Sequence, residues 1–314
     1  MEGVRAIEAT VAVLGDQPQV IAAARQLGWQ VVVAPEQEVD LVVVPWSPDL
    51  SPRPSESPLL VVGAPPEQVA RLLLAGADEA VSAGVSVEEL AARMLALVRR
   101  ARAERDRSPL TGLPGAARLE QTVRERLQRG ETPALLLLDI DNFKAFNDRY
   151  GHWRGDAVIR SLAHLVQRAA ALDPQALVAH IGGDDLCVVT RPDRVDAIGS
   201  SCVQAFDAQA PAHYDEDDRR RGYITTRART GRRQQFRLMT LTAVAATAEA
   251  EDMEHFGQLF EVLAELKAYA KRRSGSTYFR DRRRDHGWQR VAGIGDDSPI
   301  PGEETNNGQK DTPG

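Results

Sequence analysis

The chain has 314 residues, enough for two domains with their own cores, and at 43% hydrophobic and 27% charged it has the composition of an ordinary soluble globular protein. Its net charge of −6 gives no general case for nucleic-acid or membrane binding, and two cysteines exclude a secreted disulfide framework. No stretch approaches the roughly 18 apolar residues of a membrane helix, and the first ten residues do not resemble a signal peptide. The cytoplasm is therefore the expected compartment.

The first third of the chain alternates short apolar runs with amphipathic ones, which predicts a parallel sheet with helices on its faces. We expect strands at Thr10–Leu14, Gln30–Ala34, Leu41–Val44, Leu59–Val62 and Ala80–Ser82, and helices at Val20–Leu27, Gln68–Ala75 and Val87–Arg107. Ser86 is a good N-cap for the last helix, because its hydroxyl can accept from a first-turn N–H. That helix is apolar first and charged later. It is either the last helix of the domain with a solvated tail, or a linker helix that carries dimer contacts to the C-terminal part.

Residues 1–105 resemble a response-regulator receiver, a flavodoxin-like fold, most clearly in the run AGADEAVSAGVSVEELAARMLALVRR. The chemistry of that family is mostly missing. The phosphoacceptor position at the end of the third strand is Pro45, and one acid of the pair after the first strand is Gly15. Proline offers neither a nucleophilic carboxylate nor a ligand for Mg²⁺, so we expect a degenerate receiver-like domain that is not phosphorylated.

The connections around the third predicted strand cannot hold the helices that a receiver has there. Only residues 35–40 precede this strand, and the run SPDLSPRPSESP that follows is too rich in proline for a helix. A parallel sheet is normally covered on both faces, so one face lacks its cover. Two interpretations stay open: the bare face docks on a second copy, the C-terminal domain or a protein partner, or the proline-rich loop lies across it.

The most informative stretch is 134–156, ALLLLDIDNFKAFNDRYGHWRGD. It begins with an apolar run too short for a globular helix, which predicts a buried strand that ends at Asp139-Ile140-Asp141. In α/β proteins, ligands bind at this end of a strand.

Two helices should follow the strand. Asp141 is expected to cap a short one, Phe143–Tyr150, which Gly151 closes. Asp156 is expected to open a longer amphipathic helix with one apolar face, formed by Val158, Leu162, Leu165 and Ala169.

A second stretch, 177–190, reads as two apolar strands joined by Gly182-Gly183-Asp184-Asp185. Glycine and aspartate between strand-like runs indicate a hairpin turn. Such a turn beside the strand that ends at Asp141 would bring Asp184 close to Asp139. Paired carboxylates with flanking backbone oxygens suit Mg²⁺, which prefers a few carboxylates plus substrate phosphates. The two glycines let a bulky phosphate approach the backbone.

These stretches resemble the GGDEF family, the diguanylate cyclases, over residues 108–285. The DxDxFKxxND–GHxxGD signature and the GGDEF loop of the family are met by Asp139, Asp141, Phe143, Lys144, Asn147, Asp148, Gly151, His152, Gly155, Asp156 and Gly182-Gly183-Asp184-Asp185-Leu186. The resemblance implies a nucleotidyl-cyclase-like α/β domain with a mainly antiparallel central sheet. It also implies a bacterial signalling protein that condenses two GTP into cyclic di-GMP and pyrophosphate. Each domain holds one GTP, so a homodimer is implied, controlled here by a non-phosphorylatable receiver-like domain.

The resemblance also assigns roles to single residues. The Mg²⁺ or Mn²⁺ ligands would be Asp139, Asp184 and the backbone carbonyl of Ile140. The substrate-binding residues would be Asn142, Phe143 and Lys144 along the phosphates, Asn147 and Asp156 at the guanine edge, and His152, Gly182 and Gly183. The residues acting in catalysis would be Asp185 and Lys271. For His152, a packed or solvent-facing side chain is an equal interpretation.

Several positions depart from the family pattern. The second acid of the loop is Asp185 instead of Glu, and a misplacement of about 1 Å can cost on the order of 10²-fold in rate. The arginine two residues before the glycines is His180, which clamps phosphate poorly, and the aspartate that opens the domain is Ser108. Two alternatives therefore stay open: an active cyclase, and a catalytically inactive GGDEF domain that acts as a GTP-binding or protein-interaction module.

The C-terminal part adds an unusual feature. Tyr223–Arg229 and Arg232–Val244 read as a long hairpin with an arginine-rich tip, which either binds phosphates, RNA or an acidic partner or is a solvated, self-neutralising extension. For the chain as a whole, neither a nucleic-acid partner nor a membrane is expected. Phe256–Ala270 should be the last helix and Thr277–Phe279 the last strand. Residues 286–314 are too polar to bury a core and are expected to be disordered.

Overall fold

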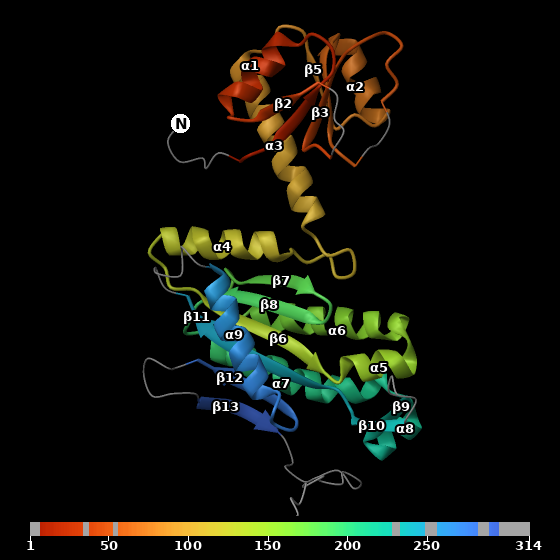
Figure 1. The fold of residues 1–314 in the computed structure, drawn as a ribbon, viewed down its shortest axis with the longest axis vertical. Coiled ribbons are helices and arrows are strands. Elements are labelled where there is room, and N and C mark those ends of the chain that lie inside the picture. The colour runs from red at the N-terminus through yellow and green to blue at the C-terminus, as the bar shows by residue number, and fades with distance from the viewer. Residues whose placement is uncertain are drawn as a thin grey trace, which may run out of the picture. The chain divides into compact units, whose positions relative to one another are not determined.

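The computed structural model describes residues 7–33, 38–52, 56–227, 233–248, 256–281 and 289–294. The chain divides into two compact units, Met1–Asp106 and Arg107–Gly314, drawn in Figure 1. Among the described residues, no helix has both the length and the apolar character needed to cross a bilayer.

The N-terminal unit is built on a five-stranded parallel sheet in the order β2-β1-β3-β4-β5. Its strands are β1 (Thr10–Val13), β2 (Gln30–Val32), β3 (Leu41–Pro45), β4 (Leu59–Ala64) and β5 (Glu79–Ser82), and its helices are α1 (Pro18–Gln26), α2 (Pro66–Leu74) and α3 (Val87–Arg105). This strand order is that of flavodoxin-like folds, so the predicted architecture of the unit is confirmed.

The two faces of this sheet are covered differently. Leu60 and Val62 of β4 join a core with α1 and α3, whereas Val61, between them, belongs to a second cluster with α2. Leu50 of the proline-rich segment and Trp46, directly before it, pack against this second cluster. The structure therefore favours the interpretation that the loop helps to cover this face, which has α2 as its helix.

Helix α3 begins as expected, because the hydroxyl of Ser86 accepts from the backbone N–H of Glu89 at 3.1 Å. It ends at Arg105, two residues before the predicted end. Its charged half is anchored to its own unit: Arg102 binds the carboxylate of Asp40 at 2.8 Å, and Arg105 donates to a backbone carbonyl of the same unit at 2.6 Å. The predicted solvated tail is therefore held at these two points.

The C-terminal unit contains a six-stranded sheet in the order β13-β12-β11-β6-β8-β7. Its strands are β6 (Ala134–Asp141), β7 (Leu177–Gly182), β8 (Asp185–Thr190), β11 (Thr240–Thr247), β12 (Ser276–Arg280) and β13 (Gln289–Ile294). Within it, β11 and β12 pair in parallel and the other described pairs are antiparallel, which confirms the mainly antiparallel sheet.

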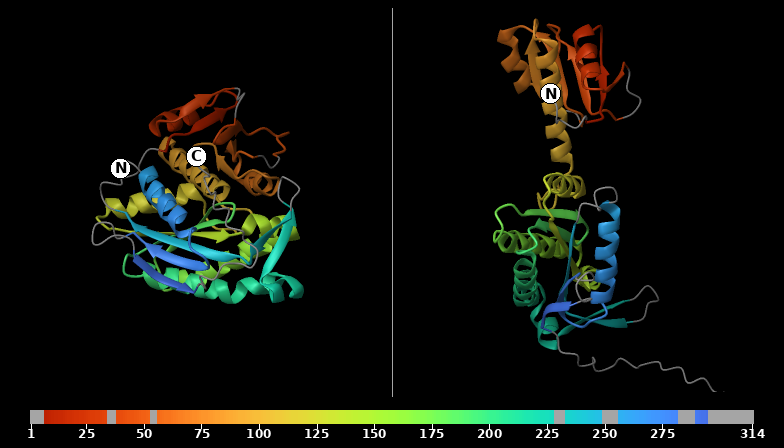
Figure 2. Two further views of the ribbon diagram at one scale, coloured as in Figure 1. Left: turned by 60° about the horizontal axis from the view of Figure 1, so that its bottom comes forward. Right: turned by 90° about the vertical axis from the view of Figure 1, so that its left-hand side faces the viewer.

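Helices cover both faces of this sheet, as the right-hand view of Figure 2 shows for α9 on one side and α6 and α7 on the other. The helices of the unit are α4 (Ala116–Gln128), α5 (Phe143–Tyr150), α6 (His152–Ala170), α7 (Val195–Gln209), the short 3₁₀ helix Ala210–His213, α8 (Glu216–Arg221) and α9 (Phe256–Ala270). Side chains alternate along β6: Leu135 and Leu137 pack with α4 and α9, and Leu136 and Leu138 with α6 and α7. Because both faces are buried, the strand is apolar from Ala134 to Leu138.

The predicted long hairpin is wrong in its second arm. β9 (Tyr223–Arg227) pairs with β10 (Arg233–Arg237) in a separate two-stranded ribbon, and the chain then enters the central sheet as β11. The composition explains the break, because RQQFR is polar and TLTAVAAT is apolar enough for a buried strand. Arg229 and Arg232 of the predicted tip lie outside the described residues.

The predicted disordered tail is wrong at its start. Gln289–Ile294 form β13, which pairs antiparallel with the edge strand β12. An edge strand offers unpaired backbone N–H and C=O groups, so a short segment can join it through main-chain hydrogen bonds without a large apolar face. Residues 286–288 and 295–314 of the predicted tail lie outside the described residues.

Gly199 of α7 lets the ring of Tyr278 pack directly against this helix. A Cβ at Gly199 would lie 2.5 Å from the ring of Tyr278, whose hydroxyl donates to Asp196 at 2.7 Å. We expect Gly199→Ala to lower the free energy of unfolding by about 2 kcal/mol through overpacking, although alanine is normally favoured in a helix by roughly 1 kcal/mol. Urea denaturation would measure this. Gly257→Ala in α9, where nothing lies within 4 Å of the new Cβ, is the matched control and should not destabilise.

Candidate functional site

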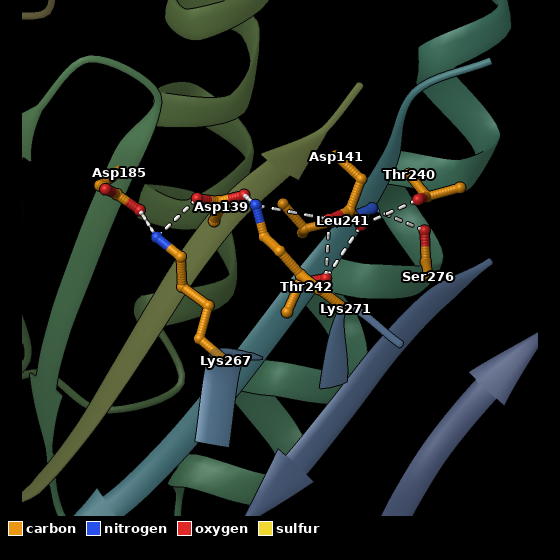
Figure 3. Close-up of polar contacts among 9 residues, drawn as sticks. All are labelled: Asp139, Asp141, Asp185, Thr240, Leu241, Thr242, Lys267, Lys271 and Ser276. Atoms are coloured by element: carbon orange, nitrogen blue, oxygen red, sulfur yellow. Dashed lines mark hydrogen bonds and ion pairs between the residues drawn. The ribbon is translucent and has the colours of Figure 1, made fainter. Parts of the chain in front are cut away.

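The end of β6 collects the acidic side chains that the sequence singled out (Figure 3). Asp139 and Asp141 are at the end of this strand, and Asp185 begins β8. Leu138 of β6 is directly opposite Leu186 of β8, so Asp139 and Asp185 follow as neighbours in adjacent strands. The tight turn before β8 carries Asp184, which confirms the predicted hairpin.

Lys267 in α9 and Lys271, the first residue after this helix, approach the acids one helical turn apart. The Nζ of Lys267 lies 2.6 Å from Asp139 Oδ2 and 2.7 Å from Asp185 Oδ1, so one ammonium joins two carboxylates. The Nζ of Lys271 pairs with the other oxygen of Asp139 and lies 3.8 Å from Asp141 Oδ1. Lys267 was not predicted. Its spacing of one helical turn from Lys271 was the signal that could have found it.

The charges at this cluster are unevenly compensated. Burial raises the pKa of the Asp139 carboxyl, but the two lysines outweigh burial and hold this pKa below its usual value. Burial raises the pKa of Asp185, against the opposing pull of Lys267. The pKa of Asp184 is raised to about 6, first by burial and then by the negative charges of Asp139 and Asp185. Asp184 therefore carries the charge that most needs a cation.

The predicted cap at Asp141 is wrong. The Asp141 carboxylate accepts hydrogen bonds from the hydroxyls of Thr240 and Thr242, both at 2.9 Å, on the neighbouring strand β11. The N-cap of α5 is instead Asn142, which has the left-handed conformation with φ 60° and makes no side-chain cap. Asparagine is among the few residues that tolerate this conformation. The first-turn N–H groups of α5 are therefore left without a side-chain cap, which suits an anion.

The oxygens at the end of β6 fit a divalent cation by their chemistry. Asp139 Oδ1 is buried and accepts no well-directed hydrogen bond, and no described lysine or arginine forms an ion pair with Asp184. Ile140 has its side chain in the core, so only its backbone can take part. Within the described ranges, no three acids, histidines or thiols form a complete metal site. Mg²⁺ commonly completes its shell with substrate phosphates, which matches such a partial set.

A second group of predicted residues lies where α5 meets α6. Asn147 Oδ1 is buried without a hydrogen-bond partner, and a Cβ at Gly155 would lie only 1.9 Å from it. Glycine is therefore required at 155 for Asn147 to keep this position, and Asp156 follows directly. The prediction that Asp156 opens the long helix is wrong, because α6 begins at His152, an exposed residue.

An open cavity of about 1180 Å³ lies beside α5. Asn142 and Lys144 line it together with side chains of the β9–β10 ribbon, such as Thr225 and Gln234. The acids at the end of β6 do not line this cavity. The cavity is therefore a separate surface, formed by α5 and the β9–β10 ribbon.

Two departures from the family pattern, Ser108 and His180, are in contact with each other. Ser108 Oγ lies 2.7 Å from Nδ1 of His180, and Nε2 of His180 lies 2.9 Å from the carbonyl of Gly183. Because a carbonyl only accepts, Nε2 carries the proton and Nδ1 accepts from the serine. His180 thus ties the start of the domain to the glycine turn, where Gly182 and Gly183 both have positive φ.

The structure therefore brings Asp139, Asp184, Asp185 and Lys271 together and places Asn147 in contact with the segment before Asp156. The individual roles of these residues remain predictions.

Comparison with known proteins identifies the family of this region. Residues 105–242 match the family described as "Diguanylate cyclase, GGDEF domain". Diguanylate cyclase DgcP of Pseudomonas aeruginosa is 39% identical over 94 residues, 28% of this chain and 14% of that protein. Diguanylate cyclase DgcZ of Escherichia coli is 38% identical over 84 residues, 26% of this chain and 28% of that protein. The chain spans less than half the length of the curated relatives it matches.

Solved structures of low identity are also similar. The coiled coil and GGDEF domain of DgcB from Caulobacter crescentus in complex with c-di-GMP is 21% identical, covers 60% of this chain and 92% of that chain, and has a TM-score of 0.44.

Proposed function

We propose that the chain is a cyclic di-GMP signalling protein, because residues 105–242 form a GGDEF domain. In this proposal the C-terminal unit binds GTP. Paired with the same unit of a second copy, it condenses two GTP into cyclic di-GMP. The observation that carries the proposal is the acid cluster at the end of β6, where Asp184 lies beside Asp139 with its charge uncompensated. We place this activity in the cytoplasm, where GTP is available.

The guanine end of the proposed site uses the buried Oδ1 atom of Asn147. This atom has no partner in the described structure and can accept an N–H of the base. Asp156 can accept from the guanine N1–H and the exocyclic amine, a pair of donors that adenine does not present. An unpaired buried acceptor costs free energy until a ligand satisfies it, so this end favours guanine over adenine.

The phosphate end lies between α5 and α9. We assign the phosphate oxygens to the first-turn N–H groups of α5, Lys144 and Lys271. Gly182 and Gly183 have no side chains, and the space around their Cα atoms is open, which leaves room for a phosphate. A divalent cation at Asp139, Asp184 and the Ile140 carbonyl would neutralise phosphate charge.

The reaction forms one P–O bond and breaks one at each nucleotide. The 3′-hydroxyl of one GTP attacks the α-phosphate of the other and loses its proton, and pyrophosphate leaves. The chain contributes orientation of the two nucleotides and charge stabilisation, which together can supply a large part of a rate enhancement. Two domains must face each other, so we propose a homodimer, with the non-phosphorylatable receiver-like unit as the controlling part.

One observation favours the second candidate, a GTP-binding domain without turnover. Asp185, at the position of the second acid, is held by Lys267 at 2.7 Å and is one methylene shorter than glutamate. If this pairing persists in the complex, the domain binds GTP and signals by contact with a partner.

Incubation of the pure full-length chain with GTP and Mg²⁺, followed by chromatography of the nucleotides, separates the candidates. We expect cyclic di-GMP and pyrophosphate from GTP and no product from ATP. GTP binding by calorimetry without any product would establish the second candidate, and absence of binding would contradict both.

A further inference from the structure

The two lysines of the acid cluster stand out in the composition of the chain. Of its 39 lysine and arginine residues, only four are lysines: Lys144, Lys267, Lys271 and Lys310. Two of the four, Lys267 in α9 and Lys271 directly after it, contact Asp139 (Figure 3). A lysine ammonium is a compact point charge, whereas a guanidinium is a wide planar fork. A lysine ammonium can therefore occupy the space of a metal ion between two carboxylates.

Lys267 is the more enclosed of these two lysines. Its side chain is 22% exposed, against 39% for Lys271. Its Nζ contacts one oxygen of Asp139 and one of Asp185, and the Asp139 side chain is only 8% exposed. In such partly buried surroundings, an ammonium this close to two carboxylates cancels much of the field that would attract a divalent cation.

We infer that Lys267 is a resident counter-ion that competes with the divalent cation for the acids at the end of β6. The cation can use Asp139 Oδ2 only when the Lys267 ammonium has left it. The long lysine side chain allows this movement without unfolding of α9. Asp184, which no described lysine or arginine pairs with, remains to receive the cation. The free protein therefore binds divalent cations weakly, and the site opens when the phosphates of a nucleotide draw the ammonium away. The inference rests on the proposed function only in treating these acids as a cation site.

Binding of Mn²⁺ to the full chain without nucleotide tests this, with free Mn²⁺ measured by electron paramagnetic resonance. Lys267→Met removes the charge and keeps a linear side chain, and Lys267→Arg keeps the charge. We expect Lys267→Met to bind Mn²⁺ tighter than the wild type by about tenfold or more, because a neighbouring positive charge is lost, and Lys267→Arg to stay near the wild type. The double variant Lys267→Met/Asp184→Ala should lose this gain in Mn²⁺ affinity. Equal affinity of Lys267→Met and the wild type would overturn the inference.

A second measurement is made on the wild-type chain and uses a variant only to assign one signal. Because the chain has four lysines, lysine-selective isotope labelling gives few side-chain NMR signals. The signal that is missing from the spectrum of Lys267→Arg belongs to Lys267. We expect this signal to shift when Mg²⁺ is added to the protein with 3′-deoxy-GTP, which lacks the attacking hydroxyl. A signal that stays unchanged while Mg²⁺ binds would contradict the displacement of Lys267.

The two proposals fail separately. If Lys267→Met binds Mn²⁺ more tightly than the wild type, and the wild type yields no cyclic di-GMP, the counter-ion role is supported and the cyclase activity is contradicted. If the wild type forms cyclic di-GMP but binds Mn²⁺ as tightly as Lys267→Met does, the cyclase activity is supported and the counter-ion role of Lys267 is overturned.

Discussion

Replacing Asp184 with asparagine should abolish cyclic di-GMP formation and, at the same time, make the protein more stable near neutral pH. The loss of product follows because an amide oxygen carries no charge for the cation. The gain in stability follows because the raised pKa of Asp184, about 6, means that the fold disfavours its ionised form. The amide of the variant would keep the shape of the carboxyl group without that charge.

The sign of the pH dependence follows from the same pKa. In the unfolded chain Asp184 titrates at about 3.9. Between that pH and about 6 the folded state binds more protons than the unfolded state, so the free energy of unfolding falls as pH rises through this window. Because Asp184 is partly exposed, we discount the effect to about 1 kcal/mol. Asp184→Asn does not lose stability in this way. Its free energy of unfolding should therefore exceed that of the wild type at pH 7 and equal it near pH 4.

Thermal denaturation of both proteins at several pH values, with product analysis by chromatography, would measure the two effects. Asp16→Asn, at an exposed position of the other unit, is a control that should change neither. Product from Asp184→Asn would contradict its place in the site. A lower melting temperature than the wild type near neutral pH would contradict a destabilising charge at the partly buried Asp184.

Gly155→Ala should weaken GTP binding more than the addition of a single methyl group would suggest. The new Cβ would lie 1.9 Å from Asn147 Oδ1, so the asparagine must leave the position from which it would bind guanine. Loss of such hydrogen bonds, worth about 1–3 kcal/mol, predicts an affinity for GTP lower by roughly 10- to 100-fold. Calorimetry with GTP would measure it.

A double-mutant cycle separates the displacement of Asn147 from a general loss of structure. Asn147→Ala alone should weaken GTP binding by a similar factor, because it removes the same acceptor. The double variant Gly155→Ala/Asn147→Ala should bind GTP no more weakly than Asn147→Ala, since the alanine at 147 no longer meets the new Cβ. Additive losses would mean that Gly155 acts through something other than Asn147.

The sequence alone determined the architecture and most of the site. Short apolar runs alternating with helical patterns predicted the parallel sheet of the N-terminal unit, because burial on both faces requires them. The motif around Asp139 and the glycine turn before Asp185 predicted the position of the acids, since both are local in sequence. Its errors were also local: the cap at Asp141 and the start of α6 depend on single backbone angles, such as that of Asn142, which residue type only biases.

Only the tertiary structure decided which charges meet. Lys267 is 82 residues away from Asp185 along the chain, and no periodicity relates them. The contact between Ser108 and His180 spans 72 residues, and it joins two departures that appeared independent in the sequence. The physical reason is that ion pairs and hydrogen bonds act over a few ångströms in space. The sequence states which groups exist, whereas the packing of α9 against the sheet brings a lysine, rather than water, to the two acids.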